Sequence, residues 1–368
     1  MYRSLNYEDY VYKDFTEITD MFEIQISPSL IPLVKRKTKG KTFLERLYDV
    51  RKHADVDYGL PIPPVHVTDN MCLGPYEYAI YFNGVEQERY KIPDGYYYCI
   101  DIGDIIPDIV DCSKYEKTTE PSFGMVSYLV PKEDKDLFEK AGYLCVFQET
   151  IITTHLFEII KKNRTKILTQ CMVNELTEKV RQLNPDVFTD VFFNHKFPVS
   201  DLKILLNTLL EEYVSIRDMN TILEAVADYL QEEKNPLKLA EKVRVRLAYS
   251  FIKNYMDKDF VVHAIKVSEN LSNILCENVY YPKSRIEPPN IALKPDVKNK
   301  VVESITASLK EIKEKGYAPT ILCDSSLRLP FATFAHQYFP GIPVFSDVEI
   351  VSLNCRYLIK FEGEIFIE

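Results

Sequence analysis

The N-terminal part of the chain mixes the hydrophobic periods of strands and of a helix. Residues Phe22 to Ile26 alternate apolar and polar side chains, as a half-buried strand does, and residues 43–53 suit a short helix. The apolar run Tyr78 to Phe82 leads into Asn83-Gly84, a pair typical of a tight hairpin turn. Another strand is predicted over residues 96–100. This part is therefore expected to be α+β.

A helix followed by a strand is predicted next. The pattern favours a helix from residue 133 that ends at Gly142, then a strand over residues 143–147. Thr153 or Thr154 can cap the helix that follows, because a threonine side chain can accept a hydrogen bond from a free N–H group of the first turn.

From Ile167 to about Tyr255 the period is helical. Ser200 and Ser215 are predicted to open two helices, and Asp218 stands near the position that a capping box uses. Each helix carries an apolar stripe that we expect to be core: Leu202, Leu205, Leu206 and Leu209 in the first, and Met219, Ile222, Leu223 and Val226 in the second. A third helix is predicted over residues 237–254.

The C-terminal part alternates helices and strands. Prolines collect between Tyr280 and Pro295 and mark a connector. Beyond it the pattern predicts a helix over 301–315, a strand over 320–323, a helix over 330–338 and a strand over 343–345. That order indicates a small α/β unit, so the whole chain is expected to be an α+β and α/β protein of several small subdomains.

Composition narrows the classes of function. The 368 residues carry a formal net charge of −10, which disfavours nucleic-acid binding because phosphates attract cationic surfaces. The sequence has no run approaching the roughly 20 apolar residues of a membrane helix. The eight cysteines form no CxxC pair and no zinc-finger spacing, so we expect reduced thiols, no metal and no cofactor.

Candidate chemistry is sparse. Gly40-Lys41-Thr42 matches the end of a phosphate-binding loop, but Lys35 stands where that loop needs a glycine. One alternative is a thiol- or phosphate-dependent enzyme centred on Cys323 to Ser326, at a strand end that could open a helix. The other is a nucleic-acid-binding helix over 237–254, whose cationic side chains are Lys242, Arg244, Arg246 and Lys253.

Several segments, in order, resemble the FlhA/SctV family of type III protein export gates. They are Ile62 to Asn70, Tyr78 to Val85, Glu120-Pro121-Ser122-Phe123-Gly124, Ala141-Gly142-Tyr143 with Thr154-His155-Leu156, Val214 to Ala225, Gly316 to Pro319, Leu327-Arg328, and Ile342 to Ser346 followed by Glu349-Ile350. The resemblance covers about Phe22 to Ile350. Thr221 to Glu224 with Ala227 to Tyr229 looks closer to the flagellar than to the injectisome branch.

The resemblance implies a docking platform rather than an enzyme. Its expected partners are export chaperone–cargo complexes, the stalk subunit of the export ATPase complex, the cytoplasmic domain of a switch protein, and copies of itself in a ring, nonameric in the family. Nucleic acid is not expected. The expected place is the cytoplasmic face of the bacterial inner membrane, reached through an N-terminal membrane half that this sequence does not contain.

The resemblance also implies site residues and boundaries. Glu120, Phe123 and Thr154 correspond to family positions that bind chaperone–substrate complexes in a cleft between the first two subdomains. Without the resemblance, Phe123 would be interpreted as core and Thr154 as a helix cap. Ring contacts are expected from the arm and the helical subdomain, at Tyr7, Tyr10, Phe15, Arg217 and Asp218. The expected subdomains are an arm (1–20), a first α+β subdomain (21–103 with 150–168), an inserted α+β subdomain (104–149), a helical subdomain (169–266) and an α/β subdomain (267–368).

Overall fold

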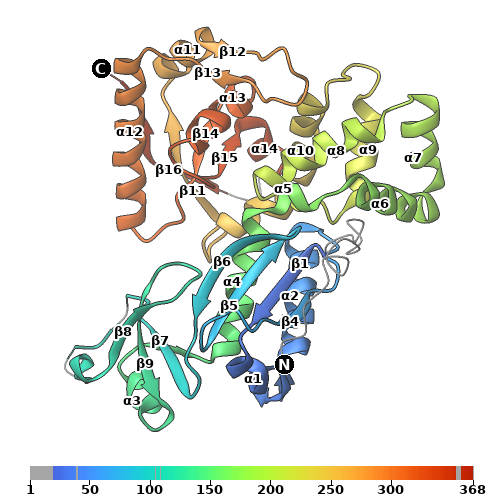
Figure 1. Cartoon of the computed structure of the whole chain (residues 1–368). Coiled ribbons are helices and arrows are strands. Elements are labelled where there is room, and N and C mark those ends of the chain that lie inside the picture. The colour runs from blue at the N-terminus through green and yellow to red at the C-terminus, as the bar shows by residue number, and fades with distance from the viewer. Residues whose placement is uncertain (1–19, 39, 104, 108, 354–357, 368) are drawn as a thin grey trace. The chain divides into compact units, whose positions relative to one another are not determined.

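The structure, a computed structural model, describes residues 20–38, 40–103, 105–107, 109–353 and 358–367. Figure 1 traces the chain and labels its elements. The chain divides into two compact units. The first takes in the chain up to Ala54 and Pro61–Asn163, and the second takes in Asp55–Leu60 and Arg164–Glu368. The predicted α+β and α/β class with several small parts is confirmed.

The first unit contains a four-stranded sheet in the order β4-β1-β5-β6. Its strands are β1 (Phe22–Ile26), β4 (His66–Asp69), β5 (Glu77–Phe82) and β6 (Val85–Lys91). Strand β1 runs parallel to β4 and antiparallel to β5. Asn83 and Gly84 have φ values of 48° and 76°, so both central residues of the β5–β6 turn are left-handed, as a type I′ hairpin requires. The predicted hairpin is confirmed. The other elements are α1 (Ile31–Lys35), β2 (Lys37–Thr38), β3 (Lys41–Thr42), α2 (Phe43–Tyr58) and α4 (Gln148–Lys162).

A second sheet in the same unit has the order β10-β7-β9-β8. Its strands are β7 (Tyr96–Ile100), β8 (Glu116–Thr119), β9 (Val126–Pro131) and β10 (Leu144–Val146), and α3 (Lys135–Lys140) packs on β7 and β10. Buried Tyr97, Cys99, Val130, Phe138 and Tyr143 contribute to its core. Because β7 pairs with β9 and β10, this sheet begins before the expected boundary at residue 104.

The second unit begins with a group of helices. They are α5 (Arg164–Ile167), α6 (Gln170–Leu183), α7 (Pro185–Thr189), a π-helical turn (Asp190–Asn194), α8 (Val199–Glu211), α9 (Met219–Tyr229) and α10 (Pro236–Ile252). Both predicted apolar stripes are buried, those of α8 and of α9. The stripes were correctly assigned because a helix buries one face at the 3.6-residue period.

A parallel sheet in the order β15-β14-β11-β16 follows. Its strands are β11 (Val261–Val267), β14 (Ile321–Cys323), β15 (Val344–Ser346) and β16 (Leu358–Ile365), and α12 (Pro295–Glu314) packs against β11 and β16 (Figure 1). The remaining elements are α11 (Glu269–Glu277), β12 (Val279–Tyr280), β13 (Asn290–Ile291), α13 (Ser325–His336) and α14 (Asp347–Val351). Since β11 belongs to this sheet, the α/β part begins before residue 267.

Four predicted helix starts were wrong. Helix α4 begins at Gln148, so Thr153 lies inside it and donates its hydroxyl to Glu149 O at 2.9 Å instead of capping the helix. Helix α9 is capped by Asp218 rather than opened by Ser215. Helices α12 and α13 also begin earlier, at Pro295 and Ser325. Proline suits the first turn of a helix, where its missing N–H would have no partner within the helix, and Pro295 takes that position in α12. Pro330, at which α13 was predicted to start, lies inside that helix instead.

Among the described residues, no helix combines the length and the apolar character that crossing a bilayer requires.

Candidate functional site

Glu120 folds its side chain back into the turn between β8 and β9. Its carboxylate accepts hydrogen bonds from the N–H groups of Ser122 at 2.8 Å and Phe123 at 2.6 Å, and its own N–H donates to Met125 O at 3.0 Å. Glu120 is 2% exposed. Gly124, with φ +68°, completes the turn in the left-handed region that favours glycine. Both carboxylate oxygens thus bond to the turn's own N–H groups, and the part that Glu120 plays toward a partner stays a prediction.

Phe123 stands out from this turn. Its side chain is 60% exposed, so the alternative that it is a core residue is wrong. Aromatic side chains are enriched at the centres of protein interfaces, which makes an exposed phenylalanine a candidate anchor. Glu120 therefore positions the main chain that carries Phe123, and Phe123 offers the apolar surface.

Thr154 lies in the interior of α4 and is half-buried, so it is not a helix cap. The next residue, His155, is 1% exposed and fixes this part of α4 to the first sheet. Its Nδ1 lies 2.8 Å from the Tyr78 hydroxyl and its Nε2 lies 2.8 Å from a Glu88 carboxylate oxygen. Burial lowers the pKa of His155, which favours a neutral ring that accepts from Tyr78 and donates to Glu88.

Strand β6 links the helix that carries Thr154 to the turn that carries Phe123. Glu88 and Tyr90 both belong to β6 and are two residues apart, so they project from the same face. Glu88 binds His155, while the Tyr90 hydroxyl donates to the carbonyl of Thr119, the residue before Glu120. The structure thus connects all three predicted binding residues to one strand.

The predicted ring residues fall into two groups. Tyr7, Tyr10 and Phe15 lie outside the described residues. Asp218 caps α9, accepting from Thr221 N at 3.1 Å and from the Thr221 hydroxyl at 2.7 Å. Arg217 is exposed, and it lines a surface pocket of about 620 Å³ together with Asp57 and Lys253. Both side chains are exposed, and that of Asp218 is already engaged in capping α9.

Gly59 fixes the main chain beside Arg217. It follows α2 with φ +74°, and the Ile216 N–H donates to Tyr58 O at 2.9 Å. A Cβ on Gly59 would lie 2.3 Å from Arg217 N, so the two main-chain segments touch at a distance that glycine alone permits.

Three of the residues named for the two alternative functions are buried or already paired. Cys323 is 5% exposed, and burial raises the pKa of its thiol well above the ordinary value, the opposite of what an activated thiolate needs. Arg244 is 2% exposed and pairs with Glu349 at 2.7 Å. Arg246 forms an ion pair with Asp228. Of the four cationic side chains predicted to face nucleic acid, Arg244 is therefore buried and Arg246 is already paired, whereas Lys242 and Lys253 are exposed.

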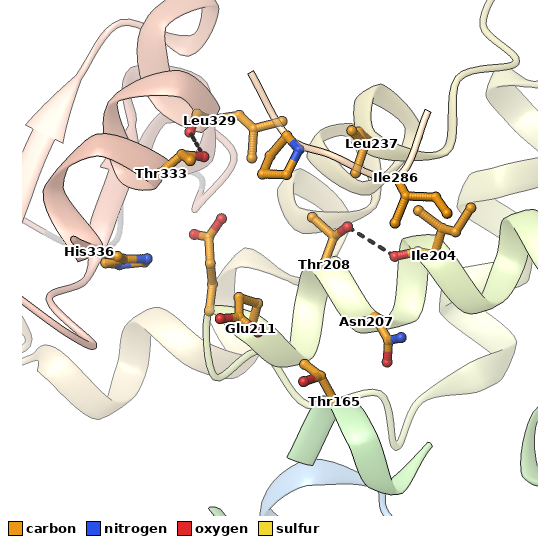
Figure 2. Close-up of a pocket in the computed structure, with 12 residues that line it drawn as sticks. Thr165, Ile204, Asn207, Thr208, Glu211, Leu237, Ile286, Leu329, Thr333 and His336 are labelled. Carbon is orange, nitrogen blue, oxygen red and sulfur yellow. Dashed lines mark hydrogen bonds between the residues drawn. The ribbon is translucent and has the colours of Figure 1, made fainter. Parts of the chain in front are cut away.

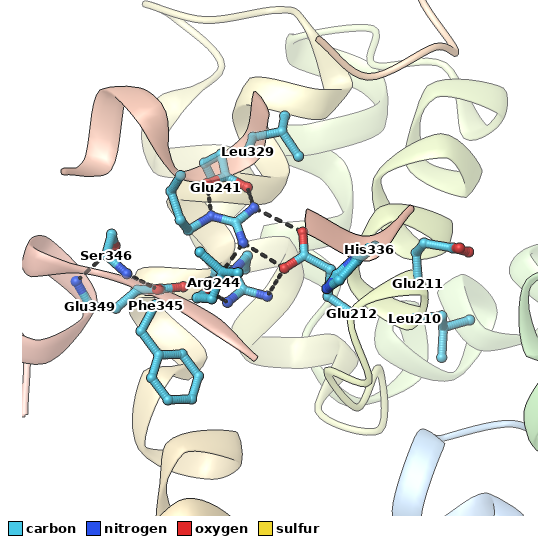
Figure 3. A network of polar contacts seen from close by, with 12 residues as sticks. Leu210, Glu211, Glu212, Glu241, Arg244, Leu329, His336, Phe345, Ser346 and Glu349 are labelled. Atoms are coloured by element: carbon cyan, nitrogen blue, oxygen red, sulfur yellow. Dashed lines mark hydrogen bonds and ion pairs between the residues drawn. The ribbon is translucent and has the colours of Figure 1, made fainter. Parts of the chain in front are cut away.

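A buried ion-pair network joins the helices of the second unit to its parallel sheet, and sequence reasoning missed it (Figure 3). Arg328 of α13 is 0% exposed and donates to both Glu241 and Glu212, with its Nη2 2.9 Å from Glu212 Oε1. Arg244 of α10 lies 3.1 Å from Glu212 Oε2. Burial opposes ionisation of Glu212, but Arg328 and Arg244 outweigh it and lower the pKa of Glu212 to about 2.

A signal for one part of this network was present in the sequence. Ser346 and Glu349 form a capping box: the Ser346 side chain accepts from Glu349 N, and the Glu349 carboxylate accepts from Ser346 N at 2.7 Å. The spacing S-x-x-E predicts such a box. The remaining Glu349 oxygen, Oε1, accepts from Arg244.

A pocket of about 360 Å³ lies between α8 and α13 (Figure 2). Apolar side chains such as Ile204, Leu237 and Leu329 line much of it. The hydroxyls of Thr208 and Thr333 donate to carbonyls of their own helices at 2.9 Å, so as donors they are already engaged. We assign no ligand to this pocket.

The fold of this chain is similar to that of several solved structures. The Chlamydia pneumoniae CdsV protein matches with a TM-score of 0.82 at 24% identity, covering 96% of this chain and 99% of that chain. A structure of the Chlamydia pneumoniae CdsV and CdsO protein complex matches with a TM-score of 0.82 at 23% identity and the same coverage. Nonameric EPEC SctV-C matches with a TM-score of 0.73 at 17% identity, covering 94% of this chain and 98% of that chain. These likenesses define the class of fold: a mixed α+β chain of several small parts.

Sequence comparison then gives the family. Residues 6–354 match the FHIPEP family, and the chain belongs to it. The flagellar biosynthesis protein FlhA of Treponema pallidum is 30% identical over 312 residues, 84% of this chain and 43% of that protein. FlhA of Borreliella burgdorferi is 27% identical over 349 residues, 93% of this chain and 48% of that protein. The chain thus spans about half the length of these relatives. The predicted resemblance to the FlhA/SctV family is confirmed.

Proposed function

We propose that the chain is a docking platform of a type III protein export gate and is not an enzyme. It binds chaperone–cargo complexes, with Phe123 as the apolar anchor, Thr154 as a polar contact and Glu120 as the residue that positions Phe123. The observation that carries this proposal is an aromatic side chain, 60% exposed, on a turn that a buried carboxylate holds closed. Preorganised exposed aromatic residues serve well as interface anchors, because little conformational entropy is lost on binding.

Phe123→Ala tests the docking site. We expect calorimetry with a cognate chaperone–cargo complex to show binding by the unchanged protein and a loss of at least about ten-fold in the variant, as for an interface anchor. The melting temperature should hardly change, because the ring is exposed. Phe193→Ala, a matched change at a side chain 66% exposed in the second unit, should bind normally. Equal affinity for both variants would move the site elsewhere, and no binding to any export chaperone would remove the docking function.

We also propose that the chain assembles into a ring, nonameric in the family, with contacts from Tyr7, Tyr10, Phe15, Arg217 and Asp218. The nonameric state of EPEC SctV-C, which has this fold, supports the assembly. Exposed Arg217 is the cation to test. Native mass spectrometry at high protein concentration should detect oligomers that Arg217→Glu weakens, whereas oligomers that are indifferent to the charge reversal would exclude Arg217 from the interface.

Further partners follow from the same proposal. The CdsV and CdsO complex supports a protein partner on a chain of this fold. We propose the stalk subunit of the export ATPase complex and the cytoplasmic domain of a switch protein, on the cytoplasmic face of the inner membrane. The FlhA relatives support the flagellar branch. Calorimetric titration of each purified partner tests these contacts, and a partner that gives no binding is excluded.

A further inference from the structure

Two cysteines lie opposite each other on neighbouring strands of the second sheet. The antiparallel register of β7 and β10 pairs Cys99 with Cys145. Side chains of directly paired residues project from the same face of a sheet. Both cysteines belong to the hydrophobic core of this sheet, where Cys99 is 0% and Cys145 is 8% exposed. Both are free thiols in this structure.

The hydrogen-bond pattern shows which kind of pair they form. Asp101 N donates to Val126 O at 2.9 Å, one step beyond the Ile100–Ser127 pair of β7 and β9. Because N–H directions alternate along a strand, the N–H of Cys99 also points toward β9. Cys99 and Cys145 therefore form a pair without backbone hydrogen bonds between them.

Such pairs bring side chains close enough for a covalent bond. Their Cα atoms lie about 4.5 Å apart, compared with about 5.5 Å in hydrogen-bonded pairs. Disulfides form across Cα separations of about 4.4–6.8 Å. The pairing of β7 with β10 therefore already brings the two cysteines within the separation that a disulfide needs.

We propose that Cys99 and Cys145 are an oxidisable thiol pair, which a peroxide closes to a cross-strand disulfide. In the first step the Cys145 thiolate attacks a peroxide oxygen. The S–O bond forms, the O–O bond breaks, and the leaving hydroxide takes up a proton as water. In the second step the Cys99 sulfur attacks the Cys145 sulfenic acid. The S–S bond forms, the S–O bond breaks, and water leaves with the Cys99 proton. Two thiols are oxidised and one peroxide is reduced to two waters.

The two cysteines differ in a way that assigns their order. Cys145 is the more exposed of the two. Hydrogen bonding from Cys99 lowers the pKa of Cys145, although burial opposes it, and the same contact raises the pKa of Cys99. Cys145 is thus the thiol that reacts first with the oxidant, and Cys99 is the thiol that resolves the sulfenic acid.

The disulfide would join β7 and β10, the first and the last strand of the second sheet along the chain. Strand β7 follows Pro93, and β10 is followed by Gln148, whose Nε2 donates to Tyr96 O at 2.7 Å and to Pro93 O at 3.2 Å. A disulfide beside this contact encloses the chain between residues 99 and 145. It should therefore restrict the unfolded state and stabilise this sheet.

Peroxide treatment tests the pair in a protein in which four of the other cysteines are replaced by serine. These are Cys72, Cys171 and Cys276, which are exposed, and Cys355, which lies outside the described residues. Mass spectrometry should find a peptide linking Cys99 to Cys145 that a thiol reductant releases. The oxidised protein should melt roughly 5–10 °C higher. In Cys99→Ala, Cys145 should accumulate as a sulfenic acid that dimedone traps.

Cys323→Ala is the matched control, because Cys323 is also a buried cysteine but lies in the other unit. The link between Cys99 and Cys145 should form in it as in the parent protein. Both thiols remaining free for alkylation after peroxide treatment and unfolding would overturn the proposal. So would a link from Cys145 to Cys112, which is half-buried in the same sheet's core. These outcomes do not depend on whether the chain binds chaperones.

Discussion

Arg328→Ala should destabilise the second unit by about 3–5 kcal/mol, the cost of leaving a buried charge without its partner. The substitution removes the guanidinium that faces both Glu212 and Glu241, and Glu212 is 8% exposed. Glu241, which is 23% exposed, would lose the arginine that it pairs with, and Glu212 would keep only Arg244. In a unit of this size, the melting temperature should fall by roughly 10 °C. Thermal unfolding followed by circular dichroism measures the change.

Arg246→Ala provides the matched control for this prediction. Arg246 also pairs with a carboxylate, that of Asp228, but the two side chains are 48% and 53% exposed. Exposed pairs contribute about 0–1 kcal/mol, so this variant should melt close to the parent protein. Equal losses in the two variants would show that burial of the Arg328 network does not matter.

The same network makes a prediction about pH. The pKa of Glu212 is about 2 in the folded protein, below its ordinary value of 4.5. A depressed carboxyl pKa stabilises the folded state above the unfolded value, and this contribution is lost as the pH falls toward the folded value. Acid should therefore weaken the second unit between about pH 4.5 and 2.

Gly59→Ala should be nearly as damaging. The backbone at Gly59 has φ +74°, where a side chain costs about 1–2 kcal/mol, and the added Cβ would lie 2.3 Å from Arg217 N. Main chain rather than a flexible side chain would have to move, adding roughly 1–3 kcal/mol. The total loss should reach roughly 2–5 kcal/mol, measured by chemical denaturation.

Gly316→Ala separates the two causes. Gly316 has φ +80°, yet nothing lies within 4 Å of where its Cβ would be. This variant should show the cost of the backbone conformation alone, about 1–2 kcal/mol. If Gly59→Ala costs no more than Gly316→Ala, the close approach to Arg217 is not a constraint on stability.

Local signals made much of the fold predictable. Asn83-Gly84 predicted a hairpin because few residue pairs adopt two left-handed conformations in succession. The apolar stripes of α8 and α9 were predicted correctly because each helix buries one face. The start of α4 was missed because Phe147 precedes it, and its side chain makes no capping hydrogen bond. Without that signal, the threonines farther along looked like the start.

The residues that we propose for binding were chosen from their motif, but how their side chains lie required coordinates. The sequence could not show that Glu120 turns inward while Phe123 turns outward, since both are common on surfaces and in turns. The ion-pair network of Arg328 could not be predicted from the sequence. Its partners Glu241 and Glu212 are separated from Arg328 by 87 and 116 residues, and no local periodicity records a pairing over that distance.

The π-helical turn at Asp190–Asn194 holds one more residue per turn than an α-helix would. A single residue inserted into an α-helix can produce such a turn. Losing one residue here would allow an α-helical turn and shift the last residues of this helix by about 100° around its axis. Phe193, now 66% exposed, would then point in a different direction. Relatives whose sequences are one residue shorter at this place should therefore present a different side chain to their surroundings, even if every other position is unchanged.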